Sequence, residues 1–341
     1  MACHRRLVWR VFLLAPALAS LLMGLFGGLA RMGLVGPAPS HILLGHGVLM
    51  MLGFIASLIA LERFVALRSW WSLPSYLLLA VGGVFVAAGY PSPGVFLLVL
   101  GSAAFLALHL WILLRHRQGY LVLMSVSCLL LFIGNLKLFF GLPIFEAALS
   151  WIGFLILFIM GERMEMARLR GFRYPFSAPA YIAAFLLLAA GVYTPVAVEL
   201  ASSAALILPF AVARFDLGLR FIRGHGFQRY LASGLVCGYI WLGLGGLLML
   251  LRGYHDSALH AIFLGFAGTM IMTHAPVIFP VIMKTKHLYA KNLYIPLGLL
   301  QGSTILRAPG LLDLWKISGI LTTASVASFM ILTFYNLRRI S

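Results

Sequence analysis

The amino-acid sequence predicts an all-α protein embedded in a membrane as one bundle of about twelve transmembrane helices. Three observations lead to this fold class: the composition, the division of the chain into apolar segments, and the placement of basic residues. Of the 341 residues, 62% are hydrophobic and only 10% are charged, and the mean hydropathy is +1.04. A water-soluble domain needs a polar exterior and does not reach these values. Lipid is therefore the expected solvent, and the whole chain, 1–341, is expected to form a single integral membrane domain.

Charged residues and Gly/Pro turns divide the chain into twelve apolar segments. Each is close to the roughly 20 residues that an α-helix needs to cross a bilayer. Two boundaries rest only on short turns, at 90–93 and 193–195, so ten or eleven helices are the alternative. In order, the expected helices cover 11–35, 41–67, 73–90, 93–115, 119–141, 143–163, 177–194, 196–218, 227–251, 256–283, 292–310 and 313–337.

The basic residues alternate with these segments. Twenty of the 25 Lys and Arg residues fall on the side where the even-numbered segments end, and five fall on the other side. Because basic loops are retained in the cytoplasm, both termini are expected there, with the protein in the inner (cytoplasmic) membrane of the cell. Topology then explains the net charge of +17, with anionic lipid as its counterpart and no role for nucleic acid. The five outer basic residues are Arg31, Lys137, Arg252, Arg307 and Lys316.

Two histidines are expected at matching depth near the outer face. His46 lies about five residues into the second segment and His260 about four residues into the tenth, and both segments begin at that face. Two neutral imidazoles at equal depth on separate helices can bind one haem iron from its two sides. For either histidine taken alone, an interhelical hydrogen bond is the commoner role. The three cysteines show no C-x-x-C-H motif, so a b-type haem is predicted and a covalent c-type haem is not.

Three of the outer basic residues would then be expected to bind the haem propionates. Haem carries two propionates, and these would point to the outer interface, where Arg31, Arg252 and Arg307 are the expected cationic partners.

Other polar residues inside the segments have competing interpretations. His109 and His274 are expected at similar depth near the cytoplasmic face, where they could form a second metal or haem site or act as two independent hydrogen-bonding groups. Copper is a further hypothesis, with His41, His255 or His274 as ligands, although no spacing requires it. These sites stay secondary to the His46 and His260 pair.

Two acid–base pairs of neighbours occur near cytoplasmic helix ends. Glu62 precedes Arg63, and Glu162 precedes Arg163. Local ion pairs with snorkelling side chains are ordinary at such places, so both pairs are expected to be structural.

The flanks of the two outer histidines resemble known haem-binding helices. Residues 45–54, GHGVLMMLGF, resemble the second helix of haem-copper oxidase subunit I. Residues 259–270, LHAIFLGFAGTM, resemble its tenth helix, and are still more similar to a segment of the NnrS family of membrane haem proteins. The resemblance implies an oxidase-like fold in which His46 and His260 bind one haem b. It also places Arg307 near the position where oxidases pair arginines with propionates.

The departures from that family matter for activity. An oxidase or nitric oxide reductase has a second histidine two residues before the low-spin ligand, and Ala258 stands at that position. The segments 143–163 and 177–194, which would supply copper ligands, contain no histidine. Oxygen or nitric oxide reduction at a binuclear centre is therefore disfavoured, and enzymatic activity stays uncertain.

The leading hypothesis is a membrane b-type haem protein for electron transfer or for a redox or nitric oxide stress response. A redox partner protein or the subunits of a respiratory complex would exchange electrons with it. One alternative is a proton-coupled transporter or channel, for which Pro209 and the prolines of 276–280 could break helices, although no matching repeat is visible. Another is an oxidase-like scaffold subunit without a cofactor.

Overall fold

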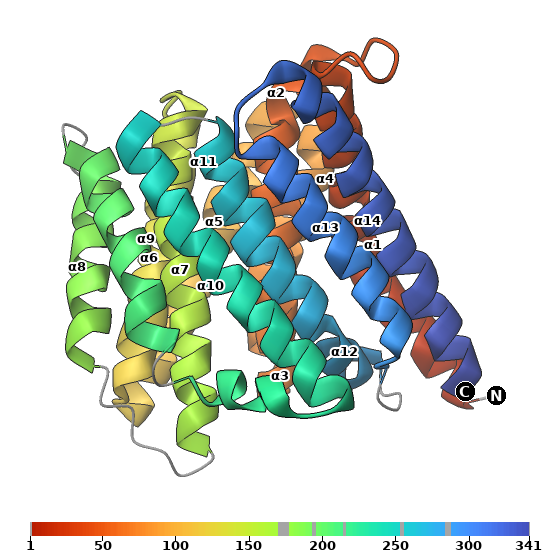
Figure 1. The fold of residues 1–341 in the computed structure, drawn as a ribbon. Helices are drawn as coiled ribbons and strands as arrows, with labels where there is room; N and C mark the ends of the chain where they lie inside the picture. Colours follow the sequence, from red (N-terminus) through yellow and green to blue (C-terminus); the bar gives the residue numbers. More distant parts are fainter. Residues whose placement is uncertain are drawn as a thin grey trace.

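The computed structural model describes residues 2–169, 177–192, 196–213, 216–252, 256–283 and 288–340. Within these ranges the chain is helical and contains no strand, which confirms the all-α bundle. Nine of the described helices are long and apolar enough to cross a membrane, as is typical of a multi-pass membrane protein. The helices stand side by side in Figure 1, and both ends of the chain lie at the same end of the bundle.

The nine long helices include two that change type along their length. In these two, an α-helix passes without a break into a π-helix and back. A third, η2 with α4, begins with one turn of 3-10 helix. The nine are α1 (Ala2–Arg31); α2, η1 and α3 (Ser40–Val48, Leu49–Ala56, Ser57–Leu67); η2 and α4 (Trp70–Ser72, Leu73–Ala87); α5 (Pro91–His116); α6 (Gly119–Phe139); α7 (Ile144–Leu169); α10 (Gly226–Arg252); α11, η5 and α12 (Asp256–His260, Ala261–Gly268, Thr269–Met283); and α14 (Leu312–Ile340).

Shorter helices complete the described chain. Three of them are α-helices that stand beside the long ones, and two are single stretches of 3-10 helix at connections. They are α8 (Ser177–Val192), α9 (Ala197–Ala213), α13 (Tyr294–Arg307), η4 (Leu217–Arg223) and η6 (Lys291–Leu293).

Most expected boundaries agree with the structure within a few residues, and three helices differ by more. The helix expected at 11–35 begins nine residues earlier, at Ala2, and ends at Arg31, because a helix can continue past the apolar segment from which its bounds were predicted. The expected helix 143–163 continues to Leu169, because the charged residues after Gly161 are paired with neighbouring helices and do not end it. The expected helix 196–218 ends as α9 at Ala213. Asp216 then caps η4 by accepting a hydrogen bond from Gly218 N, so a new 3-10 helix begins there. The turn expected at 193–195 lies outside the described residues.

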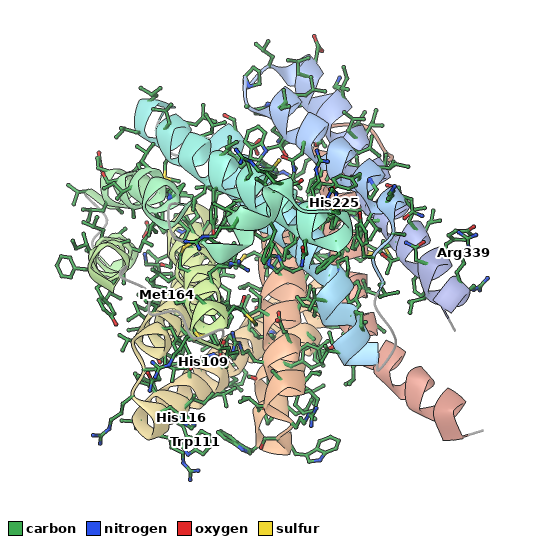
Figure 2. All side chains as sticks on the ribbon, turned by 60° about the horizontal axis from the view of Figure 1, so that its bottom comes forward. His109, Trp111, His116, Met164, His225 and Arg339 are labelled. Carbon is green, nitrogen blue, oxygen red and sulfur yellow. The ribbon has the colours of Figure 1, made fainter. Side chains whose placement is uncertain are left out.

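The two ends of the bundle differ in charge. The end that holds both termini also holds Arg63, Arg115, Arg163 and Arg168, and is called the basic end below. The opposite end is called the far end. Figure 2 turns the basic end forward and shows Trp111 and His116 there, with the Arg115 guanidinium 4.4 Å from the Trp111 ring centre. Such amphipathic side chains are typical of a membrane interface.

The π-helices follow the two outer histidines. Leu49–Ala56 begins three residues after His46, and Ala261–Gly268 begins directly after His260. A π-helix is rare and is frequently found at functional sites. The sequence contains no proline or charge at these places that would have predicted it.

Close packing of small residues holds α1, η1 and α4 together. A Cβ atom added at Gly83 would lie 2.6 Å from the Cα of Gly53 and 2.6 Å from the Oγ of Ser20. Because membrane helices associate by packing and not by escape from water, such small-residue contacts set how closely the backbones approach.

We expect Gly83→Ala to destabilise the protein by about 1–3 kcal/mol, because the added methyl group meets backbone atoms that cannot rotate away. Gly298→Ala is the matched control, since a Cβ there meets nothing within 4 Å. Thermal unfolding in detergent measures both variants. Equal midpoints for Gly83→Ala and the wild type would contradict the close packing.

Candidate functional site

The imidazole rings of His46 and His260 face each other between two helices at the far end. Their ring centres are 6.4 Å apart and their planes differ by 14°. An imidazole nitrogen lies about 1.2 Å from its ring centre and about 2 Å from a bound metal, so two rings on opposite sides of one ion are about 6.4 Å apart. The spacing therefore suits one metal ion between the rings.

The hydrogen bonds of both rings leave the same nitrogen available. His46 Nδ1 lies 2.7 Å from Gly24 O, and His260 Nδ1 lies 2.9 Å from Asp256 O. A carbonyl oxygen only accepts, so each Nδ1 carries the proton and donates it. Each Nε2 then keeps its lone pair, which is the atom and tautomer that a metal-binding histidine uses.

An ion pair holds the backbone and ring of His260 in place. The Asp256 Oδ2 atom lies 3.3 Å from His260 Nδ1 and accepts hydrogen bonds from Arg307 Nε at 2.9 Å and Nη2 at 2.8 Å. The Arg307 guanidinium is itself buried against the Met32 sulfur and the Trp315 ring. A carboxylate at the Nδ1–H of a metal-binding histidine raises the basicity of the ring and fixes its orientation.

The structure places the other expected outer cations less closely. Arg31 is the exposed last residue of α1, and Arg252 is the last residue of α10, with its side chain outside the described part of the structure. Lys137 donates to the backbone oxygen of Glu146 at 3.4 Å. Arg307 is predicted from the sequence, but its acid partner Asp256 is not. Asp256 precedes His260 by one helical turn, and that spacing is the signal in the sequence that indicates it.

An apolar cavity of about 140 Å³ lies on the basic side of the histidine pair. Met50 and Leu264, each four residues after one of the histidines, are in its wall, and Phe54 and Gly268 continue the wall one turn further. Helices α1, α13 and α14 close the remaining sides. The donor atoms and their spacing suit an axially ligated metal, and the apolar cavity beside them suits part of a hydrophobic group around that metal, as in haem.

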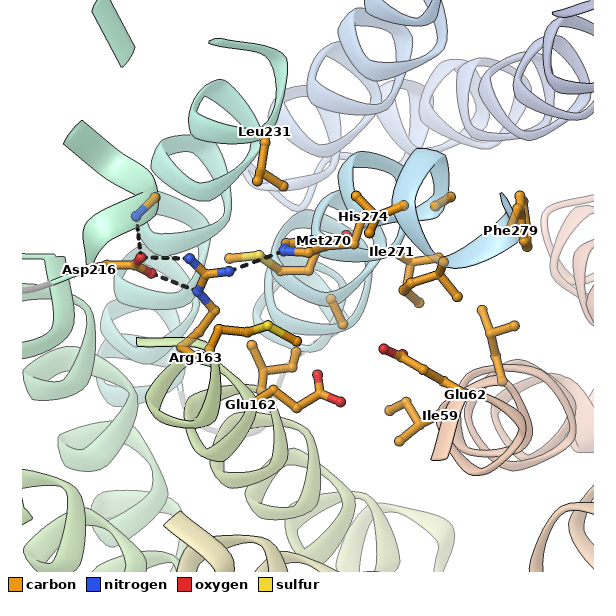
Figure 3. A pocket seen from close by; sticks show the side chains of 18 of the residues that line it. Ile59, Glu62, Glu162, Arg163, Asp216, Leu231, Met270, Ile271, His274 and Phe279 are labelled. Atoms are coloured by element: carbon orange, nitrogen blue, oxygen red, sulfur yellow. Dashed lines mark hydrogen bonds and ion pairs between the residues drawn. The ribbon is translucent and has the colours of Figure 1, made fainter. Parts of the chain in front are cut away.

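A second, larger cavity of about 440 Å³ lies at the basic end. Figure 3 shows its interior, with Glu62 projecting from α3, Glu162 and Arg163 from α7, and His274 from α12. Most of its wall is apolar. The apolar lining includes Ile55, Leu58, Ile59, Leu155, Ile159, Phe221, Phe227, Leu231, Met270, Ile271 and Phe279.

Arg163 is fixed at one wall of this cavity. Its Nε and Nη2 atoms donate to the two carboxylate oxygens of Asp216 at 2.9 and 2.6 Å, and Tyr239 donates to the same carboxylate at 2.6 Å. Asp216 lies between α9 and η4, outside the membrane-spanning helices. Burial alone would raise the pKa of this carboxyl, but the hydrogen bonds and charge of Arg163 hold its pKa below the ordinary value. Arg163 Nη1 lies 3.4 Å from Nε2 of His274.

The expected local ion pairs at this end are wrong. Arg63 pairs across to α7, where its Nη2 and Nη1 atoms lie 2.9 Å from Glu162 and 2.8 Å from Glu165. Neighbours in a helix point in different directions, whereas residues on facing helices meet, so the pairs form between helices. Glu62 has no hydrogen-bond partner among the described residues, and its carboxylate points into the cavity (Figure 3).

The structure does not bring His109 and His274 together. His109 is buried between the rings of Phe105 and Phe158, with ring centres at 4.5 and 5.4 Å, and its Nδ1 donates to Phe105 O at 3.0 Å. His274 instead faces Arg163, and its Nδ1 donates to Met270 O at 2.8 Å. Both arrangements match the expectation of two independent hydrogen-bonding histidines.

The described residues show no cluster of side chains that would support a copper site. No three His, Cys, Asp or Glu side chains gather as a metal site within the described ranges. His255 lies outside those ranges, and the His41 ring lies beside Gly89, at the start of α2.

Comparison with known families places the chain in one of them. The family model described as "Domain of unknown function (DUF8744)" matches residues 10–337, which is nearly the whole sequence, so the chain belongs to that family. No curated protein and no solved structure matches the chain.

We expect Arg63→Gln to destabilise the protein by about 3 kcal/mol, because Glu162 and Glu165 would remain in a partly buried place without their cation. Adding Glu162→Gln to this variant should recover part of the loss. Arg115→Gln is the control, with an expected change within about 0.5 kcal/mol, since Arg115 is exposed. Chemical unfolding in detergent measures all three, and equal stability of the first variant and the wild type would contradict a stabilising role for the pairs.

Proposed function

We propose that this member of the DUF8744 family is a twelve-span protein of the inner membrane that binds one haem b between His46 and His260. Its fold would resemble that of haem-copper oxidase subunit I. Its role would be one-electron transfer in a redox or nitric oxide stress response.

The observation that carries this proposal is the pairing of the two imidazoles. They come from separate helices, lie 6.4 Å apart with nearly parallel planes, and both donate Nδ1–H to a backbone carbonyl. Because Nδ1 of each ring is used in a hydrogen bond, Nε2 is in both rings the nitrogen that can bind a metal.

The helix inventory supports twelve spans. Besides the nine long helices, α8 and α9 contain shorter apolar helical segments, and α13 is a further helix of 14 residues in the same bundle. An even number of spans returns the chain to the side on which it began, and this agrees with the first and last helices, α1 and α14, whose outer ends lie at the same end of the bundle in Figure 1. The excess of basic residues at that end supports its placement in the cytoplasm.

The protein's own residues would do three things for the cofactor. His46 and His260 would supply both axial ligands, and the apolar cavity beyond Met50 and Leu264 would exclude water from the macrocycle. Arg307, with Arg31 and Arg252 at the same end, would provide positive charge for the two propionates. Bound haem b supplies a one-electron redox couple, and an iron with two protein ligands favours electron transfer over gas binding.

Replacing either His46 or His260 by Ala should abolish the low-spin b-type spectrum of the detergent-purified protein, because one axial ligand is lost. His109→Ala is the matched control and should leave the spectrum unchanged, since that ring packs between phenylalanines. Reduced-minus-oxidised spectra and a pyridine haemochrome assay measure both. Unchanged spectra in the first two variants would exclude them as ligands, and a wild-type protein without haem after expression with ample haem would refute the proposal.

Asp256→Asn should raise the midpoint potential of the haem, because a negative charge beside His260 Nδ1 stabilises the ferric state. We expect a rise of roughly 60 mV, the one-electron equivalent of a tenfold change in the equilibrium constant. Asp313→Asn, an exposed acid in the first turn of α14, is the control. A redox titration that finds equal potentials for Asp256→Asn and the wild type would contradict the coupling of this carboxylate to the site.

A further inference from the structure

The two cavities described above share a wall. Ile55, Leu58, Ile271 and Phe279 line both the apolar cavity beyond the histidine pair and the larger cavity at the basic end. A planar group in the first cavity and a ligand in the second would therefore be separated by little more than one layer of side chains. A separation of one layer of side chains is short enough for an electron to pass between the two groups.

The larger cavity combines apolar walls with hydrogen-bonding groups at one side. Its volume of about 440 Å³ falls in the range of small-molecule sites. The Glu62 carboxylate has no hydrogen-bond partner among the described residues, and Arg163 is held across the cavity by Asp216. His274 donates through Nδ1, so its Nε2 accepts, here from Arg163. A ligand with an apolar ring and polar groups at its edge would satisfy both kinds of wall.

The cavity also reaches the protein surface. Met166 on α7 and Val277 on α12 line it and are 50% and 41% exposed. Both lie on helices long and apolar enough to cross a membrane, so an apolar ligand could enter from the lipid. Gln228, also in the lining, is exposed at the start of α10, so protons could leave toward water at the same end.

Acidic residues are concentrated at this cavity. The chain has only eight Asp and Glu residues, and four of them, Glu62, Glu162, Glu165 and Asp216, lie at the cavity or pair with the arginines beside it. Carboxylates disfavour an anionic ligand, and the apolar walls disfavour a strongly hydrated cation. They suit a neutral molecule that releases protons.

We infer that the cavity binds the ring of a lipid-soluble quinol, and that Glu62 accepts a proton when the quinol is oxidised. The inference rests on the proposed haem, which takes the electrons. One quinol loses two electrons and two protons and becomes a quinone. Two ferric haems, which His46 and His260 of two protein molecules would hold, would take one electron each and become ferrous. One O–H proton passes to the Glu62 carboxylate, and the other passes to water at the basic end.

The first test mixes oxidised holoprotein with decylubiquinol without oxygen and follows haem reduction by absorbance. We expect two haems reduced per quinol, and a rate at least tenfold lower in Glu62→Gln, while dithionite reduces both proteins fully. Glu146→Gln is the matched control, because that acid lies at the far end. An unchanged rate in Glu62→Gln would overturn its role as the proton acceptor.

The second test measures binding without relying on haem reduction. Decylubiquinone binding to the His46→Ala variant is followed by equilibrium dialysis, with and without Leu231→Trp, which fills the cavity. We expect Leu231→Trp to abolish binding, and Leu244→Trp, at an exposed position of the same helix, to leave it intact.

The two tests separate the two proposals. A protein that contains haem but neither binds decylubiquinone nor is reduced by decylubiquinol overturns the quinol site and leaves the proposed function standing. A protein without haem refutes the proposed function. In that case, binding that Leu231→Trp abolishes still supports the quinone site, and binding that it leaves unchanged overturns it.

Discussion

The close approach of α1 to α2 is the contact on which the paired-histidine site depends. The backbone oxygen of Gly24 accepts the His46 Nδ1–H bond at 2.7 Å, and a Cβ atom at Gly28 would lie only 2.9 Å from Cε1 of the same ring. Because Gly28 has no side chain, the His46 ring can lie against α1. This contact fixes the rotation of the ring, and the hydrogen bond to Gly24 fixes its tautomer. With Nδ1 committed to α1, Nε2 is the nitrogen left for a partner on another helix.

His260 reaches the same geometry by different means. Its Nδ1 donates to a carbonyl of its own helix, and the carboxylate of Asp256, held by Arg307, lies beside that bond. One ring is thus positioned by helix packing and the other by an ion pair. The adjoining π-helices, eight residues each, then widen both helices just where the shared apolar cavity begins. The two histidines, the ion pair and the cavity form one connected arrangement.

The sequence allowed the membrane fold and the matched depth of His46 and His260 to be predicted, because hydropathy and charge alternation follow directly from the bilayer. It did not reveal the π-helices, which have no residue signature. It also could not show that Arg63 and Arg163 pair across helices, since partners such as Asp216 are distant in the chain and meet only through tertiary packing. Hence the sequence does not predict the larger cavity, because its polar residues come from α3, α7, α10, α12 and the residue before η4, and its acid–base neighbours look like two ordinary helix ends.

The placement of the acids argues that this cavity is more than a packing defect. Acidic residues contribute little to topology, so the membrane does not require any of them at the basic end. An ionisable side chain near a membrane interior costs free energy unless it is paired, and Arg63 and Arg163 compensate for Glu162, Glu165 and Asp216. Among the described residues, Glu62 forms no ion pair with an arginine or lysine of a facing helix. A carboxylate kept beside an apolar cavity without a hydrogen-bond partner is costly for stability alone, whereas a proton acceptor must be accessible in this way.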